Sequence, residues 1–402
     1  MTVTAPRRIV FVAPFALEPR GTVSARMIPI ARELQARGHD VTIVVPPWDN
    51  LEYSERRMEV NGVEVVNLRF EGGGLEHVRV VRRLVSAVRA LGPDLVHVFK
   101  PIAHAGIVAV VLSQFRRLGV DCPVVLDSDD WEGDGGQNER SRRSRLEELV
   151  MHYQERFAPR VVDAVTVASK TLETQMWGLG IDPERVFYVP NGQDPDRFEQ
   201  VDTTPSNLRT EYGIGDGPIV LLYTRFFEYE LARVIEVFRQ VRKRIPNVQF
   251  VIVGEGRDDD GQVFGQLAES AGIGESVHLT GWVEFDELPR VFELADVAVY
   301  PFDDTLVNRA KCPAKLTELM LAGQCIVAED VGQVGEYLVN GQSGLLSPPG
   351  DTEAFADNLI RAVRSPELQQ QLGSNARKRI LEGFAWEEIT TEIESAYEYS
   401  MG

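Results

Sequence analysis

Cysteine and long apolar runs are scarce in this 402-residue chain. Its three cysteines (Cys122, Cys312 and Cys325) have neither the spacing of a disulfide framework nor that of a metal-binding set, so a reducing cytoplasm suits the chain. No apolar run is long enough to span a bilayer, and no signal-peptide pattern is found. The sequence therefore predicts a cytoplasmic protein without a transmembrane segment.

Basic residues are scarce in the second half of the chain. Residues 196–402 carry 18 lysines and arginines against 35 acidic residues, whereas residues 1–195 carry 24 against 26. This balance argues against a nucleic-acid partner, and any basic patch in the second half is local. The first half contains arginine groups that suit an anionic acceptor, peripheral contact with the inner face of a membrane, or simply solvated helix faces: Arg79, Arg82, Arg83, Arg116, Arg117, Arg140, Arg142, Arg143 and Arg145.

The order of the apolar segments predicts an α/β protein. The length exceeds that of a usual single core, so we expect two domains. Strand-like and helix-like patterns alternate from RRIVFVAPF to VDAVTVAS, and the alternation restarts at IVLLYTRF. This spacing predicts parallel sheets with right-handed crossovers, apart from a hairpin at Asn61-Gly62. The polar residues 199–218 are predicted as the linker.

The segment from Arg309 to Asp351 contains the clearest local signals. Pro313 suits the first position of a helix, and Gly323 suits its end. Between them, apolar residues recur at helical spacing and predict one buried face: Leu316, Leu319 and Met320.

Lys315 and Glu318 lie three residues apart near the start of this predicted helix, so they project from the same side. The unsatisfied amides of a helix start favour a phosphate. A nucleotide would fit such a site, with its pyrophosphate near Lys315 and its ribose diol near Glu318. An exposed Lys–Glu pair on an ordinary amphipathic helix is the alternative.

Two regions of the sequence resemble family-4-type retaining glycosyltransferases. The first contains VDAVTVASKTLETQM and VFYVPNGQDPDRF, and the second contains PAKLTELMLAG and DVGQVGEYLVNGQSGLLSPPGD. The resemblance implies the GT-B fold, in which two Rossmann-like domains have parallel sheets that face an interdomain cleft. It implies an acceptor-side domain over residues 1–198, completed by a C-terminal helix over residues 385–402. Residues 199–384 would form the domain that binds the nucleotide-sugar donor.

The resemblance also implies which residues bind the donor. Glu318 takes the place of the glutamate that binds the donor ribose. Arg225 takes the place of the arginine that binds the diphosphate, although it could instead be a strand-end ion-pair residue. The glycines expected among the donor-binding residues are Gly21, Gly254, Gly332 and Gly335.

Two residues depart from the family pattern. Glu230 stands where the family has a diphosphate-binding lysine, and Ala310 stands where it has the first glutamate of its Glu-x7-Glu motif. A carboxylate next to a pyrophosphate is strongly repulsive at low effective dielectric. Glu230 must therefore point away or be offset by a cation. Lys315 is the best-placed candidate, ahead of Arg309 and Lys311.

An acidic cluster, Asp127-Ser128-Asp129-Asp130, follows a predicted strand of the first half. It is similar to the metal-binding Asp-x-Asp of the other nucleotide-sugar fold, GT-A, and its three carboxylates could hold a divalent cation. Asp129 also stands where the family has a histidine that faces the donor sugar. We therefore predict that Asp129 or Asp130 accepts hydrogen bonds from sugar hydroxyls, with a helix N-cap as the alternative.

Three further residues leave their roles open. His104 follows a strand and could lie in the cleft, whereas His97 lies within that strand and is interpreted as a core-edge residue. Trp282 could border the nucleotide base or belong to the core.

The resemblance predicts a retaining, hexosyltransferase-type enzyme that moves a sugar from an NDP-sugar to a hydroxyl acceptor. The family's chemistry implies that the acceptor hydroxyl attacks from the leaving-group face and that the diphosphate takes its proton. Neither a cofactor nor a metal is expected, and the acceptor is a glycan, a lipid-linked molecule or a small molecule. The predicted catalytic residues are Asp129, Asp130, Arg225 and Lys315.

Two other functions fit parts of the pattern. The departures at Glu230 and Ala310 suit a non-catalytic GT-B protein that binds a ligand or partner. A nucleotide-sugar 2-epimerase would also retain the fold, but the PAKLTELMLAG and PNGQD segments favour a transferase.

Overall fold

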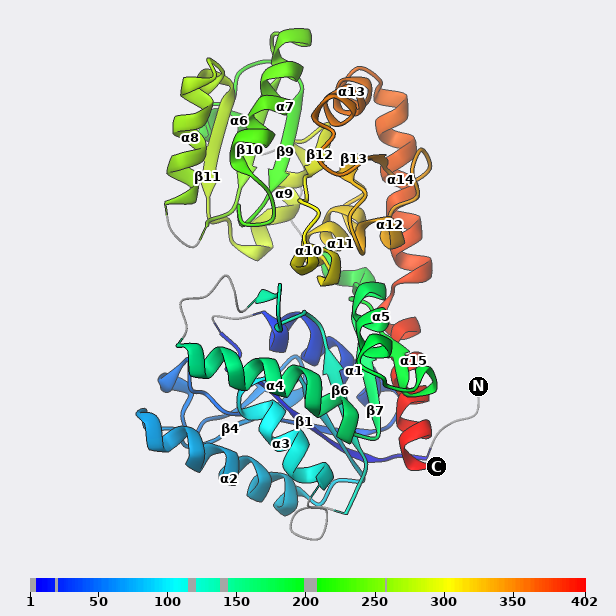
Figure 1. Cartoon of the computed structure of the whole chain (residues 1–402). Coiled ribbons are helices and arrows are strands. Elements are labelled where there is room, and N and C mark those ends of the chain that lie inside the picture. Colours follow the sequence, from blue (N-terminus) through cyan, green and yellow to red (C-terminus); the bar gives the residue numbers. More distant parts are fainter. Residues whose placement is uncertain (1–4, 19–20, 115–120, 138–143, 199–207, 257–258) are drawn as a thin grey trace. The chain divides into compact units, whose positions relative to one another are not determined.

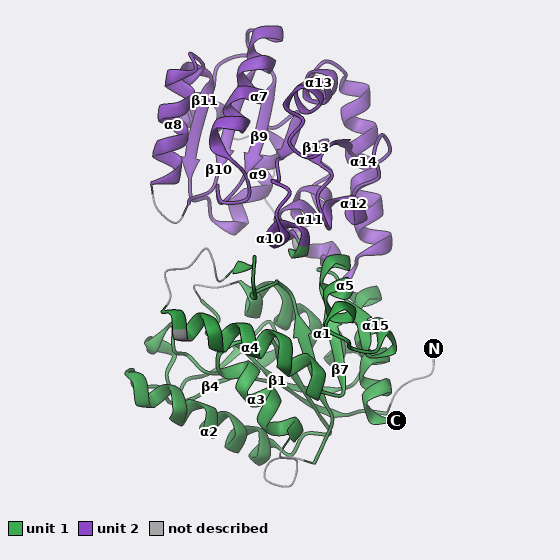
Figure 2. Cartoon of the chain, viewed as in Figure 1, with its two compact units in different colours: residues 1–191, 310–312, 386–402 green, residues 192–309, 313–385 purple. Residues whose placement is uncertain are grey.

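The computed structural model describes residues 5–18, 21–114, 121–137, 144–198, 208–256 and 259–402, without the side chains of Leu146 and Arg197. Contacts divide the chain into two compact units (Figure 2). Unit 1 comprises residues 1–191, 310–312 and 386–402, and unit 2 comprises residues 192–309 and 313–385. The chain therefore ends in the unit in which it begins.

The described part of unit 1 contains one sheet with the strand order β3-β4-β2-β1-β5-β6-β7-β8. Every neighbouring pair is parallel except β3 and β4, which are antiparallel. Asn61 and Gly62 join these two strands, and both have a positive φ, so the predicted hairpin is confirmed. The strands are β1 (Arg8–Val12), β2 (Asp40–Val45), β3 (Arg57–Val60), β4 (Val63–Asn67), β5 (Leu95–Phe99), β6 (Val124–Ser128), β7 (Ala164–Val167) and β8 (Val186–Tyr188).

Helices cover both faces of this sheet. Three of them, α2 (Gly74–Leu91), α3 (Ala103–Gln114) and α4 (Arg145–Val161), pack side by side on one face (Figure 1). The last helix, α15 (Trp386–Met401), packs against α1 (Ile28–Ala36), β7 and β8. The remaining elements of unit 1 are the π-helix η1 (Val23–Met27), α5 (Lys170–Gly178) and the short η2 (Leu51–Tyr53) and η5 (Pro183–Arg185).

The described part of unit 2 contains a second sheet with the order β11-β10-β9-β12-β13-β14, in which all neighbouring pairs are parallel. Its strands are β9 (Ile219–Tyr223), β10 (Gln249–Val253), β11 (Val277–Gly281), β12 (Val297–Tyr300), β13 (Ile326–Glu329) and β14 (Leu345–Ser347). The helices are α6 (Leu208–Glu211), α7 (Leu231–Arg244), α8 (Asp260–Ser270), α9 (Leu288–Glu293), α10 (Leu306–Ala310), α11 (Ala314–Leu321), α12 (Val334–Tyr337), α13 (Thr352–Val363) and α14 (Pro366–Gly383), with the short η6 (Pro195–Phe198), η7 (Gly274–Ser276) and η8 (Phe285–Glu287).

The core of unit 2 lies between its sheet and the layer formed by α8, α7 and α13. Phe238 of α7 stacks on Phe250 of β10 with ring centroids 4.1 Å apart, and Phe264 of α8 packs against Phe238. These rings come from the apolar stripes of amphipathic helices, so burial of the stripes fixes the helices on the sheet. The doubly wound pattern directs the carboxyl ends of the strands of each sheet toward one edge, where ligands bind in such folds.

The structure corrects three local predictions. The signature helix α11 begins at Ala314 rather than Pro313, which occupies the N-cap position. The segment before it contains an unpredicted short helix, α10. The predicted linker is partly helical, because α6 forms within it, while residues 199–207 lie outside the described residues.

No helix of the described residues is long and apolar enough to cross a membrane. Five arginines of the predicted basic groups lie outside the described residues: Arg116, Arg117, Arg140, Arg142 and Arg143.

Candidate functional site

Lys100 is the centre of a charge cluster at the carboxyl end of β5 in unit 1. Its Nζ lies 2.8 Å from Asp129 Oδ1, 2.9 Å from Asp130 Oδ2 and 3.2 Å from Glu132 Oε1. Burial by itself lowers the Lys100 pKa, but the three carboxylates outweigh it and raise that pKa well above its ordinary value. Burial raises the Asp129 pKa, but the charge of Lys100 outweighs it and holds this pKa below its usual value. The cluster is therefore a network of charged groups around one buried cation.

The turn at Gly21 reaches the same cluster. The hydroxyl of Thr22 donates to Asp129 Oδ2 at 3.2 Å, and the carbonyl of Gly21 accepts from the amide of Ala25 at 2.7 Å. A Cβ at Gly21 would meet no atom within 4 Å. The structure thus brings Gly21 close to Asp129, although the fold itself does not require a glycine there.

Asp127 forms a buried ion pair that the sequence analysis missed. Arg26 donates to both carboxylate oxygens of Asp127, at 2.8 Å from Nε and 2.6 Å from Nη2, and Thr166 donates to the same carboxylate at 2.7 Å. Burial lowers the Arg26 pKa, but Asp127 raises it above the ordinary value. Arg26 also donates to Asn191 Oδ1 at 3.0 Å, so it connects three segments of unit 1.

The structure tests two alternative roles of the acidic cluster, a helix N-cap and a divalent metal site. The next described helix, α4, is capped by Ser144 in a capping box, so the N-cap interpretation of Asp129 and Asp130 is wrong. A metal bound by all three carboxylates would have to displace both Arg26 and Lys100. No group of residues suited to a metal ion is found in the described part of the chain.

Glu155 of α4 adds a buried carboxyl group beside the cluster. Its side chain is fully buried, and neither carboxyl oxygen has a hydrogen-bond partner in the described structure. Burial, and secondly the charge of Glu132, raise the Glu155 pKa well above its ordinary value. Burial of this kind favours the uncharged form of the Glu155 carboxyl group.

Unit 2 has a hollow of about 80 Å³ at the carboxyl ends of β9 and β10. It brings together four residues that the sequence analysis singled out, namely Arg225, Gly254, Lys315 and Trp282. The other residues that line it are Tyr223, Thr224, Val253, Glu255, Val283, Phe285 and Leu288.

The two cations of the hollow, Lys315 and Arg225, differ in their surroundings. Lys315 Nζ lies 3.3 Å from the centroid of the Tyr223 ring, which is a cation–π contact. Arg225 is exposed, and no hydrogen bond or ion pair to its side chain is found among the described residues. The strand-end ion-pair alternative for Arg225 therefore has no partner in the described structure.

Two other features of the hollow depend on local geometry. Gly254 has a φ of +126°, and a Cβ there would lie 1.9 Å from the carbonyl oxygen of Thr224, so only glycine lets the two strand ends approach. Trp282 is 63% exposed, so its interpretation as a core residue is wrong.

Glu318 lies beyond Lys315 on α11 but does not line the hollow. It is only 7% exposed, so the alternative of an exposed Lys–Glu pair is wrong for Glu318. The predicted apolar face is confirmed, because Leu316, Leu319 and Met320 are fully buried.

The two glycines after α11 differ in their surroundings, because Gly332 lies against the backbone of Arg309 and Gly335 against the movable side chain of Asp330. A Cβ at Gly332 would lie 2.4 Å from Arg309 Cα, and one at Gly335 would lie 2.5 Å from Asp330 Oδ1. Neither glycine lines the hollow. Their role toward a donor stays a prediction.

Glu230 and Ala310, the two residues that depart from the family pattern, both lie outside the wall of the hollow. Glu230 is exposed at the N-cap of α7 and is not among the residues that line the hollow. Ala310 is buried, and its carbonyl oxygen accepts a hydrogen bond from Ser169 Oγ at 2.6 Å within unit 1. Arg309 pairs with Asp304, with Nη2 2.6 Å from Oδ2, which makes it a poorer candidate than Lys315 for offsetting Glu230.

The two histidines of the β5 region differ. His97 is fully buried, and its Nδ1 lies 2.8 Å from the Tyr397 hydroxyl of α15, so its core interpretation is confirmed. His104 lines a large cavity of unit 1 together with His77.

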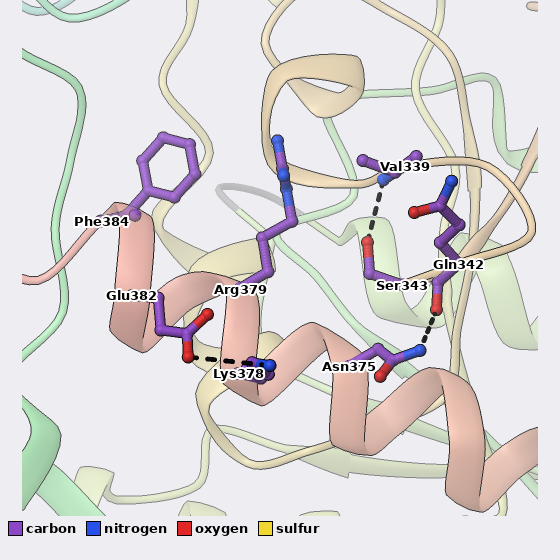
Figure 3. Close-up of a pocket in the computed structure, with 9 residues that line it drawn as sticks. Val339, Gln342, Ser343, Asn375, Lys378, Arg379, Glu382 and Phe384 are labelled. Carbon is purple, nitrogen blue, oxygen red and sulfur yellow. Dashed lines mark hydrogen bonds and ion pairs between the residues drawn. The ribbon is translucent and has the colours of Figure 1, made fainter.

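A second hollow of unit 2, of about 520 Å³, lies between α14 and the turn at residues 339–343 (Figure 3). Its polar groups bind one another or nearby backbone: Asn375 donates to the Gln342 carbonyl at 2.8 Å, and Arg379 donates to the Tyr337 carbonyl at 2.6 Å. None of the predicted site residues lines it.

Comparison with known proteins identifies the family. The model described as "Glycosyl transferase 4-like domain" matches residues 21–192, and "Glycosyl transferases group 1" matches residues 206–379. Together these two models cover most of the chain. The chain belongs to the family-4-type glycosyltransferases. The predicted class of enzyme, a glycosyltransferase, is thus confirmed.

Individual relatives agree with this assignment. The enzyme is 27% identical to the α-D-kanosaminyltransferase of Streptomyces kanamyceticus over 65% of this chain and 66% of that protein. It is 23% identical to the phosphatidyl-myo-inositol mannosyltransferase of Mycolicibacterium smegmatis over 98% of this chain and 94% of the relative. The structure of Anabaena HepE in complex with UDP and glucose superimposes with a TM-score of 0.73 at 20% identity, covering 96% of this chain and 98% of that one. The predicted GT-B fold is confirmed.

Proposed function

We propose that this glycosyltransferase binds the diphosphate of its nucleotide-sugar donor at the hollow of unit 2. The observation that carries the proposal is that Lys315 and Arg225 line one small hollow at the strand ends. Unit 2 is acidic in sequence, so two cations at one strand-end site provide local attraction for an anion that the rest of the unit would repel. Trp282 offers an exposed aromatic face to the base, as π-stacking surfaces do.

The acceptor side of the reaction is assigned to the strand ends of unit 1. Asp129 and Asp130 accept from Lys100, and each carboxylate keeps acceptor capacity for a sugar or acceptor hydroxyl. Retention of the anomeric configuration follows from the family resemblance: the acceptor hydroxyl would attack from the leaving-group face and pass its proton to the diphosphate. Glu318, Gly21, Gly332 and Gly335 remain proposed donor-binding residues.

The proposed reaction needs no metal ion. The carboxylates that would have formed a metal site are paired with Arg26 and Lys100, and the diphosphate charge is met by Lys315 and Arg225. We also propose a cytoplasmic setting, since Cys122, Cys312 and Cys325 are buried free thiols. Peripheral contact with a membrane surface stays part of the proposal.

The test is a thermal-shift screen of the full chain against UDP, GDP, ADP and dTDP, each with and without Mg²⁺. UDP comes first because the Anabaena structure contains it. A rise in the midpoint with one nucleotide, equal with and without Mg²⁺, is expected. NMR of the product from the matching nucleotide-sugar then gives its anomeric configuration. A donor that binds only with Mg²⁺, or an inverted product, would contradict the proposal.

A further inference from the structure

A large cavity lies in unit 1 and is lined by residues other than those of the donor hollow. Its volume is about 950 Å³, close to the upper end of the range for pockets that enclose a drug-sized molecule. It is bordered by the chain that follows β1, β2 and β5, at Phe15, Trp48 and Ile102, and by α2, α3 and α4. These are the carboxyl ends of parallel strands, where α/β folds bind ligands.

The wall of this cavity is mainly apolar and partly open to solvent. Val78 of α2, Ile107 of α3 and Val150 of α4 all line it, and all three belong to the exposed apolar side chains of the structure. Neighbouring apolar residues from three helices, open to water around one cavity, form a surface that an apolar occupant would cover. The charged residues of the wall are Arg82 and Glu147.

Two buried polar atoms in this wall lack a hydrogen-bond partner in the described structure. They are Gln154 Oε1 and His104 Nδ1, on side chains 5% and 6% exposed. Gln154 Nε2 donates to the carbonyl of Ala103 at 3.0 Å, which fixes the amide orientation and leaves Oε1 as an acceptor. A hydroxyl group of a bound molecule would satisfy it.

His104 fits the same ligand chemistry. Its Nε2 lies 2.9 Å from His77 Nδ1, and the two rings stack with centroids 5.1 Å apart. Burial, and secondly His77, lower the His104 pKa to about 4. His104 is thus neutral at pH 7, so the wall offers a neutral imidazole rather than a cation to the ligand.

The cavity adjoins the charge cluster through shared segments. Lys100 belongs to the cluster, and residues 102–104, which begin two positions after it, belong to the cavity wall. On α4, Gln154 of the wall precedes Glu155, the buried carboxyl group beside the cluster. A molecule seated in the cavity therefore has the proposed acceptor-side residues beside it.

We infer that this cavity holds the apolar body of the acceptor, so that the acceptor is an alcohol with a hydrocarbon or ring body rather than a polar glycan. The inference rests on the proposed function for its assignment to the acceptor. The same chemistry is supplied by a free hydrophobic alcohol or by a prenyl-type alcohol in a membrane.

The test compares two tryptophan variants on one helix. Val150 lines the cavity, whereas its neighbour Leu149 is also exposed but does not line it. Val150→Trp should fill part of the cavity and weaken binding of naphthol by at least about tenfold in calorimetric titration, while Leu149→Trp should not change it. Both variants should bind nucleoside diphosphate like the parent, because the donor hollow lies in the other unit.

A second measurement follows sugar transfer to naphthol in solution and to farnesol in phosphatidylcholine vesicles. The inference is supported if transfer to either alcohol falls in Val150→Trp but not in Leu149→Trp. The alcohol whose transfer falls, naphthol in solution or farnesol in vesicles, shows whether the acceptor is a free or a membrane alcohol. If the enzyme binds nucleotide and transfers sugar to polar acceptors only, or if Val150→Trp binds and uses the alcohols like the parent, the inference is overturned. If no nucleotide binds, the proposed function fails, whereas the naphthol titration still decides whether the cavity takes apolar alcohols.

Discussion

The strand-end sites of the two units handle charge in opposite ways. In unit 1, Lys100 is buried and ion-paired with three carboxylates, and Arg26 is buried against Asp127. In unit 2, Arg225 is exposed and Lys315 rests on an aromatic ring. The charges of unit 1 are thus largely compensated internally, which suits neutral hydroxyl ligands, whereas we propose that Arg225 and Lys315 of unit 2 receive an anion.

The largest effect that tests this comparison is expected on stability. Lys100→Met removes the buried cation and leaves three carboxylates without it, which we expect to cost about 3–5 kcal/mol of unfolding free energy. Urea unfolding of the full chain measures this loss. Lys378→Met is the matched control, because Lys378 pairs with Glu382 at the surface and its loss should cost at most about 1 kcal/mol. Equal losses in the two variants would show that the network of unit 1 is not an internally compensated site.

The next largest effect is expected on nucleotide binding when the charge of Lys315 is removed. Lys315→Met keeps the apolar stem and removes the charge, so it should weaken NDP binding by up to about 3 kcal/mol and nucleoside binding far less. Lys378→Met is the control, since Lys378 is an exposed lysine of unit 2 beside the hollow of Figure 3. In the Lys315→Met background, Glu230→Lys should recover part of the NDP affinity if both positions face the same phosphate. An unchanged NDP affinity in Lys315→Met would remove Lys315 from the diphosphate site and direct attention to Lys311.

A third effect separates the ribose from the phosphates. Glu318→Ala should weaken NDP binding by about 2 kcal/mol through the loss of a charge-assisted hydrogen bond to the ribose. Titration with NDP and with its deoxyribose counterpart provides the control. The parent should prefer the ribose form, and the variant should bind the two forms alike. A variant that keeps the parent's preference would show that Glu318 does not bind the diol.

The smallest expected effect is on sugar transfer. Asp129→Asn retains the shape of the side chain, and Lys100 keeps Asp130 and Glu132 as partners, so folding and nucleotide affinity should change little. The transfer rate should fall by about tenfold, which corresponds to roughly 1.4 kcal/mol of transition-state stabilisation. Steady-state kinetics and nucleotide titration separate these quantities. If rate and affinity fall together, Asp129 is structural rather than part of the acceptor side.

Several parts of the site could be predicted because the signal was local. Gly323 ends α11, Leu316 and Leu319 are buried, and Asn61-Gly62 forms its hairpin, since each depends on residues a few positions apart. The ion pairs of Lys100 have no such local signal. Its partners lie about thirty positions away, as the separation of Lys100 and Asp130 shows.

The open interpretation of Trp282 and the missed role of Arg26 have the same origin. The sequence did not show whether Trp282 is buried or exposed, because the residues next to an aromatic side chain after a strand do not determine its exposure. Arg26 gave no signal at all, since it lies on a short π-helix and pairs with Asp127, 101 residues away. Burial and pairing of this kind depend on which strands become neighbours.

The sequence by itself determined the α/β pattern, the signature helix and the family, because periodicity, turn residues and motifs act over short distances. Only the tertiary structure decided which charges meet and which line a hollow. It brought Lys100 to Asp129 and placed Arg225 and Lys315 around one hollow. It also left Gln154 and His104, in the wall of an apolar cavity, each with an atom that has no partner among the described residues. The physical reason is that an ion pair or a cavity wall requires side chains from distant segments, and their approach is fixed by strand order rather than by any local pattern.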